Sequence, residues 1–168
     1  MRSIYIFIGG LVAGLAIQLA VAHTGGHGTT DADSGIIQLN HVGIAVPDLE
    51  AAVSYYEETL GFPEAFRVDT PAGETALVYM QVSESTFVEL QPTNENRPAG
   101  LNHFGLQVAD MDTARAGFVA RGADVSEIRS GSTKAILSNV TELNGHRIEL
   151  SEYPPDSLQG QFLGQQAE

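Results

Sequence analysis

The sequence predicts an α+β fold made of two similar halves, each with one strand, one helix and three further strands. The first observation behind this prediction is a repeat. Residues 39–52 (LNHVGIAVPDLEAA) and 101–114 (LNHFGLQVADMDTA) agree at seven of fourteen positions at a constant offset of 62. The second observation is a shorter repeat, VEL at 88–90 and IEL at 148–150. Each half therefore carries one histidine near its start and one glutamate near its end.

The first half begins with a strand and a helix. Residues 36–46 alternate imperfectly between apolar and polar side chains and lie between a glycine and a proline, which is typical of a strand. Asp48 is a good N-cap for the following helix, whose apolar residues recur at helical spacing as far as Leu60. Gly61 predicts the end of that helix. Three strand-like runs then follow at residues 62–68, 76–82 and 86–91.

The second half repeats this plan after a turn-rich linker at residues 92–100. A strand is expected at 101–108, and Asp110 caps a helix that ends at Gly122. The further strands are expected at residues 123–129, 134–139 and 146–151. The pair Asn144-Gly145 predicts a two-residue hairpin turn between the last two strands. The tail, residues 155–168, is rich in glutamine and glycine and is expected to fray or pack loosely.

The first 35 residues are expected to lie outside the fold. Residues 1–22 start with a positive charge, continue as an apolar run and end in the small-residue pattern Ala20-Val21-Ala22, which predicts a signal peptide. We therefore expect an exported protein, periplasmic or secreted. The alternative is an uncleaved N-terminal membrane anchor, because the apolar run is long enough to span a bilayer. Residues 23–35 are small and polar and predict a flexible linker.

The composition excludes several classes of partner. The chain has 21 acidic and 8 basic side chains, a formal net charge of -13, and this argues against nucleic acid and anionic membrane surfaces. Large polyanionic substrates are also disfavoured unless Arg67, Arg97 or Arg147 are concentrated at a pocket. There is no cysteine, so the chain forms neither a disulfide nor a thiolate metal site.

Two imidazoles and two carboxylates at duplicated positions favour a metal site. His41, Glu89, His103 and Glu149 form a mixed nitrogen and oxygen set suited to divalent Fe, Ni, Co, Mn or Zn. On an octahedral ion they leave two adjacent positions, which suit a substrate with two vicinal oxygens. Both glutamates stand between apolar residues in a strand, where an ionised carboxylate is costly unless it is paired or metal-bound. The alternative is a metal-free polar cleft lined by the same residues.

Side-chain alternation in the strands predicts which residues face the ligands. His41 is expected to share a face with Leu39 and Gly43, and Glu89 one with Phe87 and Gln91.

Four motifs carry a family resemblance: NHVGIAVPDLEAAVSYYEETLGF, TFVELQP, GLNHFGLQVADMD and NGHRIELSEYP. Their order and spacing resemble the vicinal oxygen chelate superfamily, which includes glyoxalase I, methylmalonyl-CoA epimerase, extradiol dioxygenases and bleomycin resistance proteins. The likeness covers residues 36–154, as modules 36–92 and 100–154. It implies a glyoxalase-like fold, in which two paired βαβββ modules form a curled mixed sheet around an open cleft. It also implies a metal on the cleft floor, held by the four residues named above.

The resemblance is closest to the methylmalonyl-CoA epimerase and glyoxalase I branches. The epimerase branch often has Gln at the third ligand position, where Glu89 is the glyoxalase choice. In glyoxalase-like members a metal-bound glutamate detaches and acts as a base, so Glu89 and Glu149 are both candidates for catalysis. The expected reaction is an isomerase or lyase reaction through an enolate stabilised by a Lewis acid. Candidate residues of the substrate pocket are Phe66, Arg67, Tyr79, Phe104 and Asn139.

Export conflicts with the cytosolic CoA and glutathione substrates of those branches, so neither is carried over here. We expect instead a small oxygen-chelating compound such as a hydroxyketone, a catechol or an antibiotic. Two other classes stay open. A ring-cleaving dioxygenase would hold ferrous iron and consume oxygen, whereas a non-catalytic binding or resistance protein would not retain stoichiometric metal. Dimers are common in the family, so a homodimer is one expected state, with a self-contained site in each chain.

Overall fold

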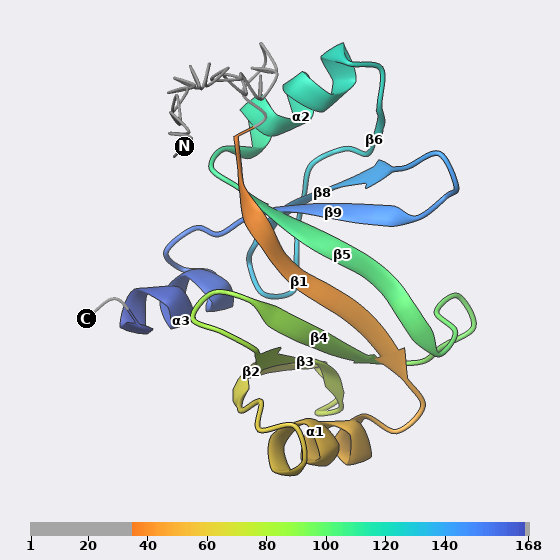
Figure 1. Cartoon of the computed structure of the whole chain (residues 1–168), viewed down its shortest axis with the longest axis vertical. Coiled ribbons are helices and arrows are strands. Elements are labelled where there is room, and N and C mark those ends of the chain that lie inside the picture. The colour runs from red at the N-terminus through yellow and green to blue at the C-terminus, as the bar shows by residue number, and fades with distance from the viewer. Residues whose placement is uncertain (1–34, 167–168) are drawn as a thin grey trace, which may run out of the picture.

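The computed structural model describes residues 35–166 (Figure 1). The predicted signal peptide and all of the predicted linker except Gly35 lie outside the described residues. Within residues 35–166, no helix is long and apolar enough to cross a membrane.

The first module has the predicted order of elements, and the second has one strand more than predicted. The first module consists of β1 (Ile36–Val46), α1 (Leu49–Glu58), β2 (Glu64–Asp69), β3 (Thr75–Gln81) and β4 (Phe87–Pro92). The second consists of β5 (Gly100–Val108), α2 (Met111–Ala120), β6 (Asp124–Val125), β7 (Arg129–Ser130), β8 (Ile136–Thr141) and β9 (Arg147–Glu152). A final helix, α3 (Leu158–Gln166), follows.

The strand expected at residues 123–129 is instead two strands of two residues, β6 and β7, which both pair with β8. The Ser126 hydroxyl accepts from the backbone N–H of Asn139, so a side chain replaces part of the ladder there.

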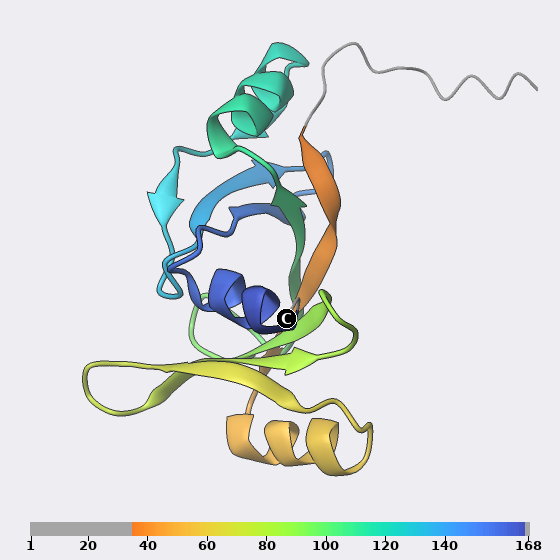
Figure 2. The ribbon, with the colours of Figure 1, turned by 90° about the vertical axis from the view of Figure 1, so that its left-hand side faces the viewer.

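One mixed sheet holds both modules together. Its order is β2-β3-β4-β1-β5-β9-β8-β6, with β7 also paired to β8. The central strands β1 and β5 are antiparallel, whereas β1 pairs with β4, and β5 with β9, in parallel. The two halves of this order mirror each other. The sheet curls, and α1 and α2 lie at opposite ends of the molecule (Figures 1 and 2), so the glyoxalase-like α+β fold is confirmed.

The helices begin where the sequence predicts and bury their apolar faces. The Asp48 carboxylate accepts from the backbone N–H of Ala51, and the Asp110 carboxylate from that of Thr113. Leu49 and Val53 of α1 pack on the sheet, and fully burying such a side chain contributes about 1.5–3 kcal/mol. Helix α1 ends at Glu58, so Leu60 lies beyond it and is exposed.

The turn between β8 and β9 is longer than predicted. The backbone N–H of Glu142 donates to the carbonyl of His146, and that of Gly145 donates to the carbonyl of Glu142. Of the residues in this loop only Gly145 has a positive φ, of 84°, whereas a two-residue type I′ turn needs a positive φ at Asn144 as well. The Glu142 carboxylate accepts from the backbone N–H groups of Asn144 and His146 and stabilises the longer loop.

As far as residue 166 the tail is folded, so the prediction that it frays or packs loosely is wrong there. Ser157 starts α3: its hydroxyl accepts from the backbone N–H of Gly160 and donates to the carbonyl of Pro154. Phe162 and Leu163 pack against a third apolar cluster, formed by Leu77, Tyr79 and Phe87. Figure 2 shows α3 within the curve of the sheet. The sequence signals for this helix are Ser157 as an N-cap and apolar residues at helical spacing after it.

Candidate metal centre

The four predicted ligands converge from four strands. His41 on β1, Glu89 on β4, His103 on β5 and Glu149 on β9 each offer one ligand atom, and these atoms all lie within 4.8 Å of one another. All four side chains are buried. The two imidazole Nε2 atoms are 3.1 Å apart, and His41 Nε2 is 3.6 Å from a carboxylate oxygen of each glutamate. The structure therefore brings the four residues together, while their role as metal ligands stays a prediction.

The two repeated glycines make room for the imidazoles. In the register of β1 and β5, His41 lies opposite Gly105, and Gly43 lies opposite His103. A Cβ atom at Gly43 would lie 2.1 Å from the ring of His103, and one at Gly105 would lie 2.0 Å from the ring of His41. Each half of the repeat therefore supplies one imidazole and the space for the imidazole of the other half.

A shift in register alters the expected faces of β1. The pairing of β1 with β5 is irregular between Leu39 and His41, where a β-bulge inserts Asn40. Asn40 and His41 are consequently both buried, while Leu39 is 53% exposed. The prediction that Leu39 shares a face with His41 is therefore wrong. Alternation on β4 holds, because Phe87 and Glu89 are both buried and the Gln91 amide donates to the Glu89 carboxylate.

Each histidine is oriented by the asparagine before it. The carbonyl oxygens of Asn40 and Asn102 lie 3.2 Å and 2.9 Å from Nδ1 of His41 and His103. The Asn40 amide donates to the carbonyl of Ser85, and Arg147 donates to Asn102 Oδ1, so in both residues the oxygen is the atom that faces the ring. His41 then carries its proton on Nδ1 and directs the Nε2 lone pair into the site. Nδ1 of His103 also lies 2.6 Å from Arg147 Nη2, which can only donate, so the contact with Asn102 does not by itself fix the proton of that ring.

This donor set fits a divalent ion. When both Nε2 atoms are unprotonated, their lone pairs lie 3.1 Å apart beside two carboxylates, and a cation between them removes their repulsion. Ligand atoms around an ion with bonds of about 2.0–2.2 Å lie roughly 3–4.4 Å apart, and the imidazole–carboxylate separations of 3.6–3.8 Å fall in this range. The set of two nitrogens and two oxygens suits Fe, Ni, Co, Mn or Zn.

Burial keeps the histidines in the neutral, ligating form. Desolvation and the positive charge of Arg147 lower the pKa of His41 to about 4. Desolvation, Arg147 and His41 lower the pKa of His103 to about 2. Desolvation and the neighbouring Glu149 raise the pKa of Glu89 to about 7, although the Tyr79 hydroxyl donates to Glu89 at 2.6 Å and opposes the rise. Burial also raises the pKa of Glu149, against the opposing effect of its arginine neighbours.

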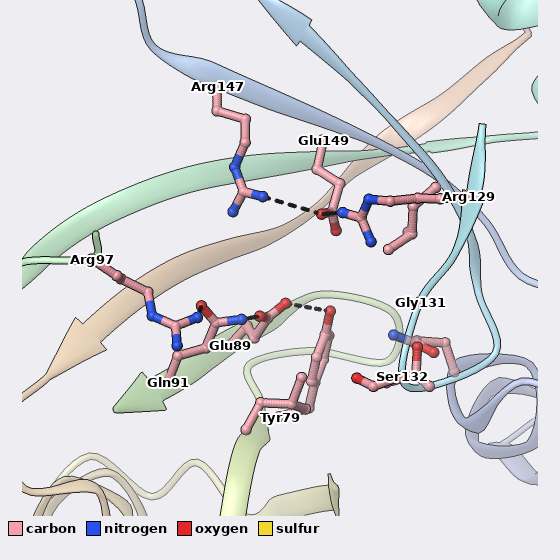
Figure 3. Close-up of a pocket in the computed structure, with 13 residues that line it drawn as sticks. Tyr79, Glu89, Gln91, Arg97, Arg129, Gly131, Ser132, Arg147 and Glu149 are labelled. Carbon is pink, nitrogen blue, oxygen red and sulfur yellow. Dashed lines mark hydrogen bonds and ion pairs between the residues drawn. The ribbon is translucent and has the colours of Figure 1, made fainter. Parts of the chain in front are cut away.

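A small cavity of about 250 Å³ opens onto both glutamates (Figure 3). Tyr79 and Gln91 line it on one side. Three arginines, Arg97, Arg129 and Arg147, also line it, although the whole chain has only eight basic residues. Arg129 Nη2 lies 3.3 Å, and Arg147 Nη1 3.7 Å, from the Glu149 carboxylate. The remaining lining residues are Leu77, Gly131, Ser132, Thr133, Leu137 and Gln159.

Of the five predicted pocket residues, Tyr79 lines this cavity and the other four do not. Phe66 stacks on the ring of Tyr79 with ring centroids 4.7 Å apart, and it packs against the apolar cluster of Leu77, Tyr79 and Phe87. Arg67 is held outside by ion pairs with Glu50 and Glu64. Phe104 lies at a separate hollow beside His146. Asn139 pairs with Glu149 across β8 and β9, and its buried Oδ1 has no hydrogen-bond partner among the described residues.

Sequence reasoning missed two parts of the site. Arg97 and Arg147 were conditional candidates, but Arg129 and Gln159 were not considered. A signal for Arg129 is the scarcity of basic residues in so acidic a chain, because each arginine is then a candidate for the functional site. Gln159 was overlooked because the tail was expected to be loose.

Comparisons with known proteins agree with this architecture. The family model described as Glyoxalase/Bleomycin resistance protein/Dioxygenase superfamily matches residues 38–150. The ethylmalonyl-CoA/methylmalonyl-CoA epimerase of Cereibacter sphaeroides is 28% identical over 130 residues, covering 68% of this chain and 97% of the relative. The mitochondrial methylmalonyl-CoA epimerase of Mus musculus is 29% identical over 129 residues, covering 68% and 72%.

Solved structures show the same fold. The methylmalonyl-CoA epimerase from Mycobacterium tuberculosis superposes with a TM-score of 0.65 at 24% identity, covering 74% of this chain and 93% of that one. A selenomethionine methylmalonyl-CoA epimerase gives a TM-score of 0.60 at 27% identity, covering 71% and 97%. These relatives are named as isomerases, in agreement with the enzyme class expected from the sequence. The chain belongs to the Glyoxalase/Bleomycin resistance protein/Dioxygenase superfamily.

Proposed function

We propose that this protein is a metal-dependent epimerase of a short acyl thioester that carries a carboxylate next to the reacting carbon. The observation that carries the proposal is the pair Glu89 and Glu149, which come from opposite modules and line one cavity beside two imidazoles (Figure 3). Inversion at a carbon needs a group that removes a proton from one face and a second group that returns one to the other face. Glu89 and Glu149 supply two such groups, one from each module.

His41, His103, Glu89 and Glu149 would hold the metal. When bound, a divalent ion supplies Lewis acidity that stabilises the enolate left after proton removal. The chain orients its imidazoles for this role through Asn40 and Asn102.

The two glutamates move the proton. One carboxylate accepts the proton as the C–H bond breaks, and the other, in its protonated form, donates a proton to the opposite face as the new C–H bond forms. No electrons are gained or lost. In the metal-free protein, burial and the neighbouring Glu149 raise the pKa of Glu89 to about 7, so this carboxyl can hold a proton near neutral pH. Tyr79 fixes Glu89 by its hydrogen bond of 2.6 Å.

The arginines indicate the charge of the substrate. Arg97, Arg129 and Arg147 line the cavity with two glutamates, so a bound divalent ion would leave the site with excess positive charge. Arginine binds carboxylates through strong charge-assisted hydrogen bonds. A malonyl-type acyl group has a carboxylate and a carbonyl on the same carbon, and one oxygen of each can chelate an ion in a six-membered ring. The relatives are named for substrates of this kind, methylmalonyl-CoA and ethylmalonyl-CoA.

This proposal replaces the sequence-based preference for a hydroxyketone, a catechol or an antibiotic. It keeps the broader expectation of a small oxygen-chelating substrate. Export through residues 1–22 is a separate proposal, because the chemistry of the site does not depend on it.

Hydrogen–deuterium exchange tests the proposal. Single epimers of methylmalonyl-CoA and ethylmalonyl-CoA are incubated in D₂O with the protein loaded with Mn²⁺, Co²⁺, Ni²⁺, Zn²⁺ or Fe²⁺, and deuterium at C2 is measured by NMR. We expect exchange with at least one ion and none after chelation. Absence of exchange for both esters with every ion would reject the proposal.

The Glu149→Gln variant tests the role of the base. We expect it to lose exchange and to retain some metal, since Gln still offers an oxygen ligand. Glu127→Gln is the matched control, because Glu127 is exposed and pairs only with Arg115 and its own loop. Full activity of Glu149→Gln would show that Glu149 is not the base.

A further inference from the structure

We infer that α3 forms a wall of the substrate cavity and that Gln159 on this helix is a specificity-determining residue that hydrogen-bonds the substrate carboxylate. The inference rests on the proposed function for the identity of the substrate group. The family model ends at residue 150, so α3 lies beyond the matched region. It is therefore a feature of this chain that the family match does not assign.

The Gln159 side chain is buried and unsatisfied. Its exposure is 2%, and its Oε1 has no hydrogen-bond partner among residues 35–166. The same side chain lines the cavity that contains Glu89, Glu149 and the three arginines. Buried amides in folded proteins are almost always hydrogen-bonded, so an amide without a partner at a cavity wall indicates a missing ligand. Oε1 is an acceptor and cannot bind a carboxylate, but the NH2 group of the same amide also makes no hydrogen bond among residues 35–166 and is the donor available to one.

The position of Gln159 is fixed by the residues around it. The backbone N–H of Leu158 donates to the carbonyl of Thr133 at 2.9 Å, which ties the start of α3 to another part of the cavity wall. A Cβ atom at Gly160 would lie 2.2 Å from the carbonyl oxygen of Pro154, so only glycine permits this close approach. On the next turn the ring of Phe162 packs against Phe87 with centroids 5.6 Å apart. Gln159 is thus held by a rigid turn, as a residue that binds the substrate directly requires.

The wall also limits the size of the substrate. The cavity of about 250 Å³ is smaller than the roughly 300–1,000 Å³ typical of sites that enclose drug-sized ligands. A short malonyl-type acyl group fits such a space, whereas the rest of a CoA ester must stay outside. The amide of Gln159, acting as a donor, would then bind a carboxylate oxygen together with the arginines.

Malonate binding tests the inference without turnover. The affinity of malonate is measured by calorimetry on the full chain loaded with Mn²⁺ and on the metal-free chain, for the wild type, Gln159→Met and Gln161→Met. Methionine keeps the length of the side chain and removes its polar atoms. Gln161 is the matched control, because it lies on the same helix, is exposed and donates to the carbonyl of Asp156 outside this cavity.

We expect Gln159→Met to weaken malonate binding about tenfold, since one hydrogen bond to a charged group is lost. Its thermal unfolding temperature should be equal to or above that of the wild type, because a buried unsatisfied amide is removed. Gln161→Met should bind malonate like the wild type. In exchange assays with methylmalonyl-CoA, Gln159→Met should raise KM more than it lowers kcat.

Equal malonate affinity in the wild type and Gln159→Met would overturn the inference, and so would a wild type that binds no malonate. Either result leaves the exchange activity of the wild type to decide the proposed function separately. Conversely, a tenfold loss in Gln159→Met without any exchange activity would support the role of Gln159 and reject the epimerase.

Discussion

The Gly105→Ala substitution should destroy the metal centre while leaving the fold intact. The added Cβ atom would lie 2.0 Å from the His41 ring, and ordinary contact begins at about 3.4 Å, so the ring must shift by at least about 1.4 Å. Metal–ligand distances tolerate only about ±0.2 Å. Gly105 has no positive φ, so the backbone itself accepts alanine without strain. The effect is therefore a direct displacement of one ligand.

The expected magnitudes differ between metal binding and stability. Overpacking a buried position costs about 1–3 kcal/mol, so the variant should remain folded with a lower unfolding temperature. Removing a residue that only hydrogen-bonds a metal ligand lowers metal affinity by up to about 100-fold. Displacing the ligand His41 itself should therefore lower metal affinity by at least about 100-fold.

Metal content after dialysis, measured by elemental analysis, and the dissociation constant for Mn²⁺ or Co²⁺ check this prediction. Gly117→Ala is the matched control, because a Cβ atom there would meet only the Arg121 guanidinium, at 3.6 Å. If Gly105→Ala binds metal as tightly as the wild type, His41 is not a ligand in the arrangement described above.

Two further predictions concern pH and the N-terminus. Because the pKa of Glu89 is raised to about 7 in the metal-free protein, binding of a metal must release this proton, and the affinity should fall as the pH drops below about 7. Tyr79→Phe removes a hydrogen-bond donor that favours the carboxylate form of Glu89, so the midpoint of this fall in metal affinity should move to higher pH. Metal-binding titrations over about pH 6–8 check both predictions. A metal affinity that does not change with pH would contradict them. The mature protein should begin at His23, as N-terminal sequencing of the exported fraction would show, and a chain retained in the membrane with Met1 intact would instead support the anchor.

The repeat was informative because the two halves of the fold are related by the pairing of β1 with β5. Identical residues at 41 and 103 and at 43 and 105 fall at mirrored positions of one antiparallel ladder. Such positions become spatial neighbours in any fold that pairs the two halves in this way. Helices α1 and α2 and their aspartate N-caps were predicted for a different reason: helical periodicity and capping depend only on residues close together in the chain.

The errors arose where distant contacts outweigh local pattern. The bulge at Asn40 depends on the register between β1 and β5, which alternation along a single strand does not reveal. Phe66 and Arg67 on β2 and Phe104 on β5 lie in strands of the same sheet, yet their side chains pack or pair outside the cavity. Sequence distance does not tell which face of a curled sheet a side chain will occupy.

The sequence by itself determined the two-module plan and the four residues that meet at its centre, because the two copies of the repeated strand pair with each other. Only the tertiary structure decided what surrounds them. The glycines proved to be the space for the opposing imidazoles, three arginines gathered in an acidic chain, and a polar tail folded as α3 against Phe87 with Gln159 at the cavity. These features depend on contacts between residues far apart in the chain, so no local pattern specifies them.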